Sequence, residues 1–198
     1  ESEAVRISRA LQRYLSPQML EHIRKQKTEI DLSTKRTELT VLFADLVGFS
    51  SIGETVEVGY LEQFLNEFFD AMTRAVFDNK GTVDKFLGDG LLAFFGEPVE
   101  VPNHALAAVS AARQMKAEMV ELNEKWSNMG IKDFEEGVSI RIGITTGIVV
   151  VGNVGSNRRM EYTVIGSAVN LASRLQGLAE PGGIMISART WTLVKDMV

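Results

Sequence analysis

The sequence predicts an α/β domain of the α+β type, with a ferredoxin-like core and extra elements toward the C-terminal end. Three observations predict it. Helical and strand-like segments alternate, a glycine-flanked hairpin lies mid-chain, and 45% of the 198 residues are hydrophobic, which is enough for one core. The order β-α-β-β-α-β, followed by further elements, is ferredoxin-like, and it predicts helices packed on one face of a mixed sheet.

The first strand and the first long helix are predicted from the spacing of their apolar residues. Residues 38–45 are apolar on both faces, which indicates a strand in the middle of a sheet. Residues 56–79 repeat apolar side chains at helical spacing. The resulting stripe consists of Leu61, Phe64, Leu65, Phe68 and Met72.

The remaining elements follow in alternation. Strands 82–86 and 91–95 flank Gly88-Asp89-Gly90, which is a hairpin signal. Gly147 is expected to separate two strands on either side of it. Strands are predicted at 138–146, 148–151, 161–165 and 183–187, and helices at 104–128, 167–179 and 188–195.

The chain divides into a lead-in and a domain. Residues 1–35 are charged and fairly polar, and we expect an N-terminal connector or helical lead-in there, while 36–198 form the domain. A solvated surface helix without function explains the lead-in equally well. The chain starts at Glu1 without a signal-type segment, so we expect a piece of a cytoplasmic protein.

Composition excludes several classes of function. The net charge of −5 and the lack of a basic run disfavour nucleic-acid and membrane-surface binding. No apolar run approaches the roughly 18 residues that cross a bilayer, so direct membrane insertion is not expected. Cysteine is absent and the two histidines, His22 and His104, are far apart in sequence. A bound metal is therefore expected to be a hard cation held by oxygen.

Two aspartates at strand ends are the first candidates for chemistry. Asp45 ends a buried strand and precedes a turn with Gly48, Ser50 and Ser51, whose N–H groups could bind phosphate oxygens. Asp89 lies at the hairpin tip. Each could simply be a turn residue. If the first strand pairs beside the hairpin, both carboxylates converge on one cation, such as Mg²⁺ or Mn²⁺.

A lysine and a polar helical pair are the next candidates. Lys85 lies within the apolar run 83–87, so it needs a partner or a ligand unless the strand lies at a sheet edge. Asn170 and Arg174 are four residues apart and share a helix face. The buried stripe of that helix is expected to consist of Leu171, Leu175 and Leu178. No Walker loop or dinucleotide fingerprint is present.

Four segments together resemble the catalytic domain of the class III nucleotidyl cyclases. They read FADLVGFS, DKFLGDGLLAFFG, RIGITTG and YTVIGSAVNLASRLQ, in that order. The resemblance covers roughly residues 35–198, and YLSPQML at 14–20 is similar to the lead-in of bacterial members. The sequence looks most like the cyanobacterial, bicarbonate-responsive adenylyl cyclases. This implies conversion of ATP to 3′,5′-cyclic AMP and pyrophosphate, with bicarbonate as an activator.

The resemblance also implies roles for individual residues in a head-to-tail homodimer with two sites at its interface. From one protomer, Asp45, Asp89 and the Leu46 carbonyl would hold two divalent ions, Mg²⁺ or Mn²⁺, with Ca²⁺ also compatible with one site. The Gly48, Phe49 and Ser50 backbone and Arg141 would contact the phosphates. From the other protomer, Lys85, Thr163 and Val164 would bind the base, Asn170 would orient the ribose, and Arg174 would stabilise the transition state.

Base choice follows from hydrogen-bond chemistry. Lys85 only donates, which suits adenine N1 and opposes guanine N1, where a hydrogen is already bound. Thr163 stands where most adenylyl members have Asp. Its hydroxyl can donate or accept, so it enforces adenine less strictly, and it resembles the bicarbonate-responsive subgroup. A second departure is strand 183–187, which lacks the phosphate-binding lysine of many members.

Three alternatives remain open at this stage. The first is guanylyl or mixed specificity, which Thr163 permits and Lys85 opposes. The second is a catalytically degenerate, dimerising module, although such copies typically lose some of the site residues that are present here. The third is another ferredoxin-like domain, such as a nucleic-acid binder, which the −5 charge disfavours.

Overall fold

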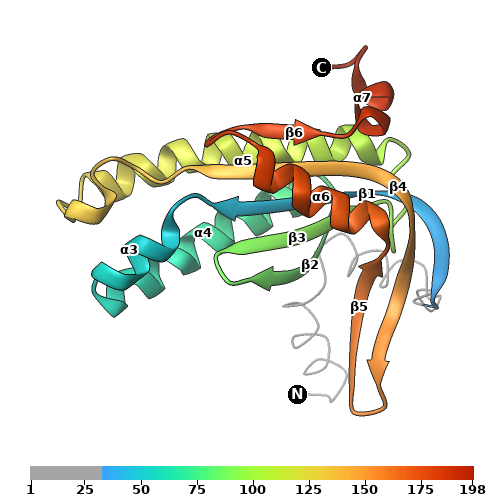
Figure 1. Cartoon of the computed structure of the whole chain (residues 1–198), viewed down its shortest axis with the longest axis horizontal. Coiled ribbons are helices and arrows are strands. Elements are labelled where there is room, and N and C mark those ends of the chain that lie inside the picture. Colours follow the sequence, from blue (N-terminus) through green and yellow to red (C-terminus); the bar gives the residue numbers. More distant parts are fainter. Residues whose placement is uncertain (1–32) are drawn as a thin grey trace, which may run out of the picture.

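The computed structural model describes residues 33–198, so nearly all of the predicted lead-in lies outside the described residues. Figure 1 shows one twisted sheet with helices on both sides. The strands are β1 (Lys35–Leu46), β2 (Thr82–Leu87), β3 (Gly90–Phe95), β4 (Ile140–Ser156), β5 (Arg159–Ile165) and β6 (Ile184–Ile186). The helices are α3 (Phe49–Thr55), α4 (Val58–Asp78), α5 (His104–Ser127), α6 (Ser167–Leu178) and α7 (Ala188–Val194), with a short 3₁₀ helix at Lys132–Phe134.

The sheet has the predicted ferredoxin-like core. Its strand order is β2-β3-β1-β4-β5, with antiparallel neighbours, and β6 pairs in parallel with β4. The predicted central position of β1 is confirmed, since β1 pairs with β3 on one side and β4 on the other. The sheet is therefore mixed, as predicted.

Gly147 does not interrupt β4, contrary to the prediction. The strand runs unbroken from Ile140 to Ser156, and Gly147 pairs with Leu39 of β1. The glycine serves helix packing instead. A Cβ on Gly147 would come within 3.2 Å of the Ala168 side chain, and one on Gly143 within 2.2 Å of the Ala172 carbonyl oxygen.

Helices cover both faces of the sheet rather than one. Residues Leu42 and Ala44 of β1 contact the core that contains α4 and α5, including the fully buried Phe64 and Trp126. Leu39 and Val41 belong to a second cluster with the α6 alanines. Because side chains alternate along a strand, these clusters lie on opposite faces. In Figure 1, α6 crosses the front of the sheet while α4 and α5 lie behind it.

The end of β4 and all of β5 project from the sheet as a long hairpin (Figure 1). This hairpin bends so that β5 approaches β2, although the two strands are at opposite ends of the strand order. A side-chain hydrogen bond joins Asp84 of β2 to Thr163 of β5. Within 33–198, no helix is both long and apolar enough to cross a membrane.

Candidate active site

Asp45 and Asp89 meet where β1 ends and the β2–β3 hairpin turns. Asp45 pairs with Gly90, and the Leu46 N–H donates to the Asp89 carbonyl oxygen at 3.3 Å. Gly90 permits this approach, because a Cβ there would lie 2.8 Å from the Ala44 carbonyl oxygen. Burial raises the pKa of Asp45 to about 6, with further contributions from a hydrogen bond to Asp89 and its negative charge.

The surroundings of this acidic pair suit a cation and a polyanion together. Arg141 lies opposite Asp45 in β4, and its charge partly offsets the rise in the pKa of Asp45. Its guanidinium donates to the Gly177 carbonyl oxygen at 3.3 Å, whereas its buried Nε atom has no hydrogen-bond partner among the described residues. Gln176 donates to Asp45 at 3.4 Å. Sequence reasoning missed Gln176, whose only signal is a polar side chain at a buried helical position.

The acidic pair fits a hard divalent cation. The negative charge of Asp89 contributes to the raised pKa of Asp45, and a positive ion between the two carboxylates would relieve this repulsion. Oxygen ligands suit Mg²⁺ or Mn²⁺. In the described part of the chain, no group of three His, Cys, Asp or Glu side chains completes a metal site. Backbone carbonyls, such as that of Leu46, and substrate oxygens would have to supply the other ligands.

The predicted phosphate loop follows directly after β1. Gly48 has a φ of 68°, a left-handed conformation that suits glycine, and it caps α3 without a side-chain hydrogen bond. Phe49 is buried and stacks on Phe64 at 5.5 Å, which fixes the loop to the core. The N–H groups at the start of α3, including that of Ser50, therefore lack a side-chain cap.

Lys85, Thr163 and Val164 form a second group, which Asp84 joins. The Thr163 hydroxyl donates to Asp84 Oδ2 at 2.6 Å, and the Val164 N–H donates to the same oxygen at 3.3 Å. Lys85 Nζ lies 3.6 Å from Asp84 Oδ1 and 3.0 Å from Glu161 Oε2. The hydrogen bond to Glu161 is the main reason why the pKa of Lys85 is raised.

A β-bulge produces this arrangement. Val83 pairs with Ala93 and Lys85 with Leu92, so Asp84 is an extra residue in the ladder. Its side chain turns toward β5, as that of Lys85 does. Sequence reasoning missed Asp84, because strict alternation places it on the face opposite Lys85. It also missed Glu161, which no spacing links to Lys85. β2 is an edge strand, and the Lys85 side chain is 35% exposed.

The buried stripe predicted for α6 is wrong. Leu171 and Leu178 are 43% and 69% exposed. The buried residues of the helix are Ala168, Ala172 and Gln176. Small side chains face inward because the α6 backbone packs directly against Gly143, where no Cβ fits.

Asn170 and Arg174 consequently lie on the outward face of α6, and both are exposed. Each residue of an α-helix is rotated by about 100° from the one before it, so Arg174 lies between Asn170 and Leu178 around the helix axis. Neither side chain forms a hydrogen bond or ion pair with another described residue. The structure therefore brings Asp45, Asp89 and Arg141 together, and separately Lys85, Thr163 and Val164. Among the described residues, no hydrogen bond or ion pair links Asn170 or Arg174 to either group.

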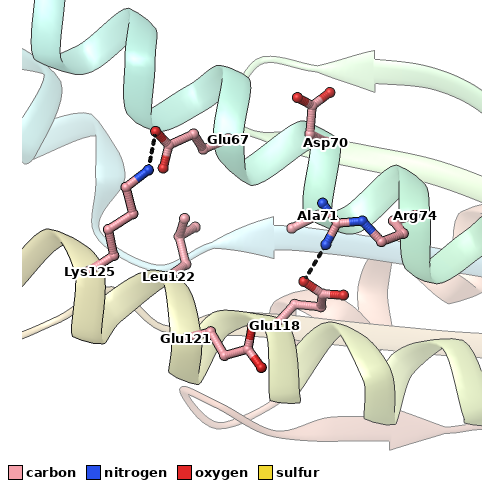
Figure 2. Close-up of a pocket in the computed structure, with 8 residues that line it drawn as sticks. All are labelled: Glu67, Asp70, Ala71, Arg74, Glu118, Glu121, Leu122 and Lys125. Carbon is pink, nitrogen blue, oxygen red and sulfur yellow. Dashed lines mark hydrogen bonds and ion pairs between the residues drawn. The ribbon is translucent and has the colours of Figure 1, made fainter.

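The pocket between α4 and α5 contains none of the predicted site residues (Figure 2). Ion pairs cross it from Lys125 to Glu67 at 2.7 Å and from Arg74 to Glu118 at 2.8 Å. Figure 2 shows these pairs joining the two helices along the groove. They stabilise the helical layer on the far side of the sheet from α6.

Comparisons with solved structures place the fold among nucleotidyl cyclases. The adenylyl cyclase CyaB from P. aeruginosa superposes with a TM-score of 0.80 and 42% identity over 84% of each chain. The guanylyl cyclase Cya2 superposes with a TM-score of 0.75 and 36% identity, over 80% of this chain and 79% of that one. The fold prediction is confirmed, and the neighbours include enzymes for both purines.

Comparisons of the amino-acid sequence also find relatives among the nucleotidyl cyclases. An adenylate cyclase of Anabaena cylindrica is 34% identical over 172 residues, which is 87% of this chain and 32% of the relative. Adenylate cyclase 1 of Rhizobium meliloti is 33% identical over 165 residues, 82% of this chain and 24% of the relative. The chain thus spans about a third or less of these relatives' length. Residues 32–198 match the family described as the adenylate and guanylate cyclase catalytic domain. The resemblance inferred from the motifs is confirmed, and the chain belongs to this family.

Proposed function

We propose that this chain is an adenylyl cyclase that converts ATP to 3′,5′-cyclic AMP and pyrophosphate. The proposal rests on the position of the Asp45–Asp89 pair beside Arg141. The two carboxylates can bind cations, and the guanidinium next to them can bind phosphate. The family match and the adenylyl neighbours support it. When bound, divalent ions would lower the pKa of the ribose 3′-hydroxyl and offset the triphosphate charge.

The proposed reaction is an in-line displacement. The 3′-oxygen forms a bond to the α-phosphorus, the bond from that phosphorus to the oxygen bridging to the β-phosphate breaks, and pyrophosphate leaves. The hydroxyl proton passes to solvent. Asp45, Asp89 and the Leu46 carbonyl would hold the ions. Arg141 and the N–H groups from Gly48 to Ser50 would bind the phosphates.

Lys85, Thr163 and Val164 would bind adenine. The ammonium of Lys85 only donates, so it matches adenine N1 and meets guanine N1 donor to donor. Lys85 donates to Glu161 at 3.0 Å and forms an ion pair with Asp84 at 3.6 Å, which leaves a further N–H for the base. Guanylyl or mixed specificity is the second candidate, supported by the Cya2 neighbour.

We further propose a homodimer with two sites at its interface. The outward face of α6 combines Asn170 and Arg174 with the exposed Leu171 and Leu178. Within the described chain, no hydrogen bond or ion pair joins these two polar side chains to the acidic pair. A two-fold dimer would bring Arg174 of one protomer to Asp45 of the other.

Complementation between two inactive variants tests the dimer. Asp45→Asn and Arg174→Ala damage opposite halves of each proposed site. When equal amounts of the two variants associate at random, half of the dimers contain one copy of each. Each such dimer has one intact site and one doubly damaged site, so about a quarter of the activity of the unmodified chain should return. Two variants that damage the same half, Asp45→Asn and Asp89→Asn, are the matched control and should not complement. Equal activity from both mixtures would contradict the shared site.

Cyclic-nucleotide production by the purified chain tests the function. ATP and GTP are supplied separately, with and without Mg²⁺, and with and without bicarbonate. Metal-dependent cyclic AMP, with far less cyclic GMP, is the expected result. A further rise with bicarbonate would support the activation suggested by Thr163. Absence of product at concentrations where the chain is dimeric would favour a degenerate, partner-binding module instead.

A further inference from the structure

The contact between Thr163 and Asp84 bears on how the base is chosen. Thr163 is 8% exposed, and its hydroxyl oxygen lies 2.6 Å from Asp84 Oδ2. The Asp84 side chain is only 1% exposed. A carboxylate buried this deeply on an edge strand requires a compensating interaction. Its partners are all in the group that would face the purine.

The direction of the hydrogen bond follows from the charge of Asp84. Burial raises the pKa of this carboxyl, but two donors and a cation oppose that rise. The Val164 N–H donates to Oδ2 at 3.3 Å, and the Lys85 ammonium lies 3.6 Å from Oδ1. Both interactions favour the carboxylate, which only accepts. The Thr163 hydroxyl must then donate its single proton to Asp84.

We infer that Asp84 sets the preference for adenine by fixing the Thr163 hydroxyl as a hydrogen-bond acceptor toward the base. This rests on the proposed function, in which Thr163 faces the purine. With its proton held by Asp84, the threonine oxygen offers only lone pairs. These match the 6-amino group of adenine, which donates, and oppose the 6-oxo group of guanine, which accepts. Asp84 is a positioning residue, since it acts through Thr163.

An alternative role for Asp84 is as a counter-ion of Lys85. Its Oδ1 atom makes no hydrogen bond within the described chain and has only this ion pair at 3.6 Å. Glu161 provides Lys85 with a closer carboxylate at 3.0 Å. The two roles differ in one respect. A counter-ion of Lys85 acts whether or not residue 163 carries a hydroxyl, whereas the positioning role requires that hydroxyl.

Binding of nucleotides that cannot cyclise tests the inference. The probes are 3′-deoxy-ATP and 3′-deoxy-GTP, which lack the attacking hydroxyl, and the readout is the ratio of their Kd values for the whole chain with Mg²⁺. Asp84→Val keeps a similar size and removes both oxygens. It should lower the preference for adenine about tenfold, the value of one hydrogen bond. Asp84→Asn retains an acceptor oxygen and should keep most of the preference.

A double-mutant cycle separates the two roles. Thr163→Val should lower the ratio by itself, and Asp84→Val should then add nothing further. Asp78→Asn makes the same loss of charge as Asp84→Asn on an exposed part of α4 and should leave the ratio unchanged. Thermal melting checks that each variant folds. Asp84→Ala, which also removes both carboxylate oxygens, replaces Asp84→Val if the latter does not fold.

The outcomes are distinct from those of the cyclase assay. A ratio for Asp84→Val within about twofold of the unmodified chain would overturn the inference, as would an equal effect of Asp84→Val when residue 163 is Val. Failure of the unmodified chain to bind either probe would overturn it too. Selective binding of 3′-deoxy-ATP by a chain that forms no cyclic AMP would refute the proposed activity and leave the inference standing.

Discussion

Gly90 lies directly opposite Asp45 in the β1–β3 ladder, at a position where no side chain fits. A Cβ there would come within 2.8 Å of the Ala44 carbonyl oxygen and 3.3 Å of Asp45 Oδ1. The glycine is therefore what allows the hairpin to bring Asp89 to the end of β1. Turn chemistry alone would not require a second glycine after Asp89.

Replacing Gly90 should consequently damage the acidic pair. We expect Gly90→Ala to displace the hairpin, destabilise the fold by about 1–3 kcal/mol and lower metal-dependent cyclase activity. Gly59→Ala is the matched control, because nothing lies within 4 Å of a Cβ at that position. It should not reduce activity. Urea denaturation and initial rates measure both effects, and full activity of Gly90→Ala would contradict the role given to this contact.

The raised pKa of Asp45 predicts a dependence on pH. Between its ordinary value of 3.8 and about 6, the folded state binds more protons at Asp45 than the unfolded state does. This residue's contribution to the free energy of unfolding therefore falls as the pH rises through that window. Without metal, Asp45→Asn should gain stability relative to the unmodified chain between pH 4 and pH 7.

The same pKa predicts that cation binding weakens in acid. Protonation of Asp45 removes a ligand charge below about pH 6. The increase in Tm on adding Mn²⁺ should thus be larger at pH 7.5 than at pH 5, and Asp45→Asn should abolish it at both. An equal increase at both pH values would argue against a cation at the acidic pair.

Arg174 should affect turnover without affecting the fold. Its side chain is exposed and makes no ion pair with another described residue, so Arg174→Ala should leave Tm nearly unchanged. If the guanidinium stabilises the developing charge, kcat should fall about 10²–10³-fold. Arg158→Ala, at the exposed tip of the β4–β5 hairpin, is the matched control. A fall of less than about threefold would remove Arg174 from this role.

A buried chain of hydroxyl groups should contribute to stability. Thr146 lies 2.9 Å from Thr40 and 2.9 Å from Thr190, and Thr40 in turn lies 2.7 Å from His104 Nδ1. Thr146→Val would leave two buried hydroxyls without this partner, at a cost of about 1–3 kcal/mol. Thr37→Val, on the same sheet and half-buried, should change stability far less. Chemical denaturation of both variants gives the comparison.

Local patterns determined most of the element order. The apolar faces of β1, the Gly-Asp-Gly turn and the helical stripe of α4 are properties of neighbouring residues, so the sequence displays them directly. The same patterns placed Asp45 and Asp89 at strand ends. Their meeting could be expected from the sheet order, because a ferredoxin-like sheet places the hairpin beside the first strand.

Tertiary structure decided which faces and partners these residues use. Helical spacing groups Asn170, Arg174 and the leucines of α6, but only the close contact of Gly143 with the helix backbone turns the alanines inward. A bulge turns Asp84 toward β5, and the bend of the β4–β5 hairpin brings Thr163 to meet it. Residues 84 and 163 are far apart in the chain, and nothing in the spacing of either segment encodes the other's position. Their contact depends on backbone departures from regular strand geometry, which periodicity cannot express.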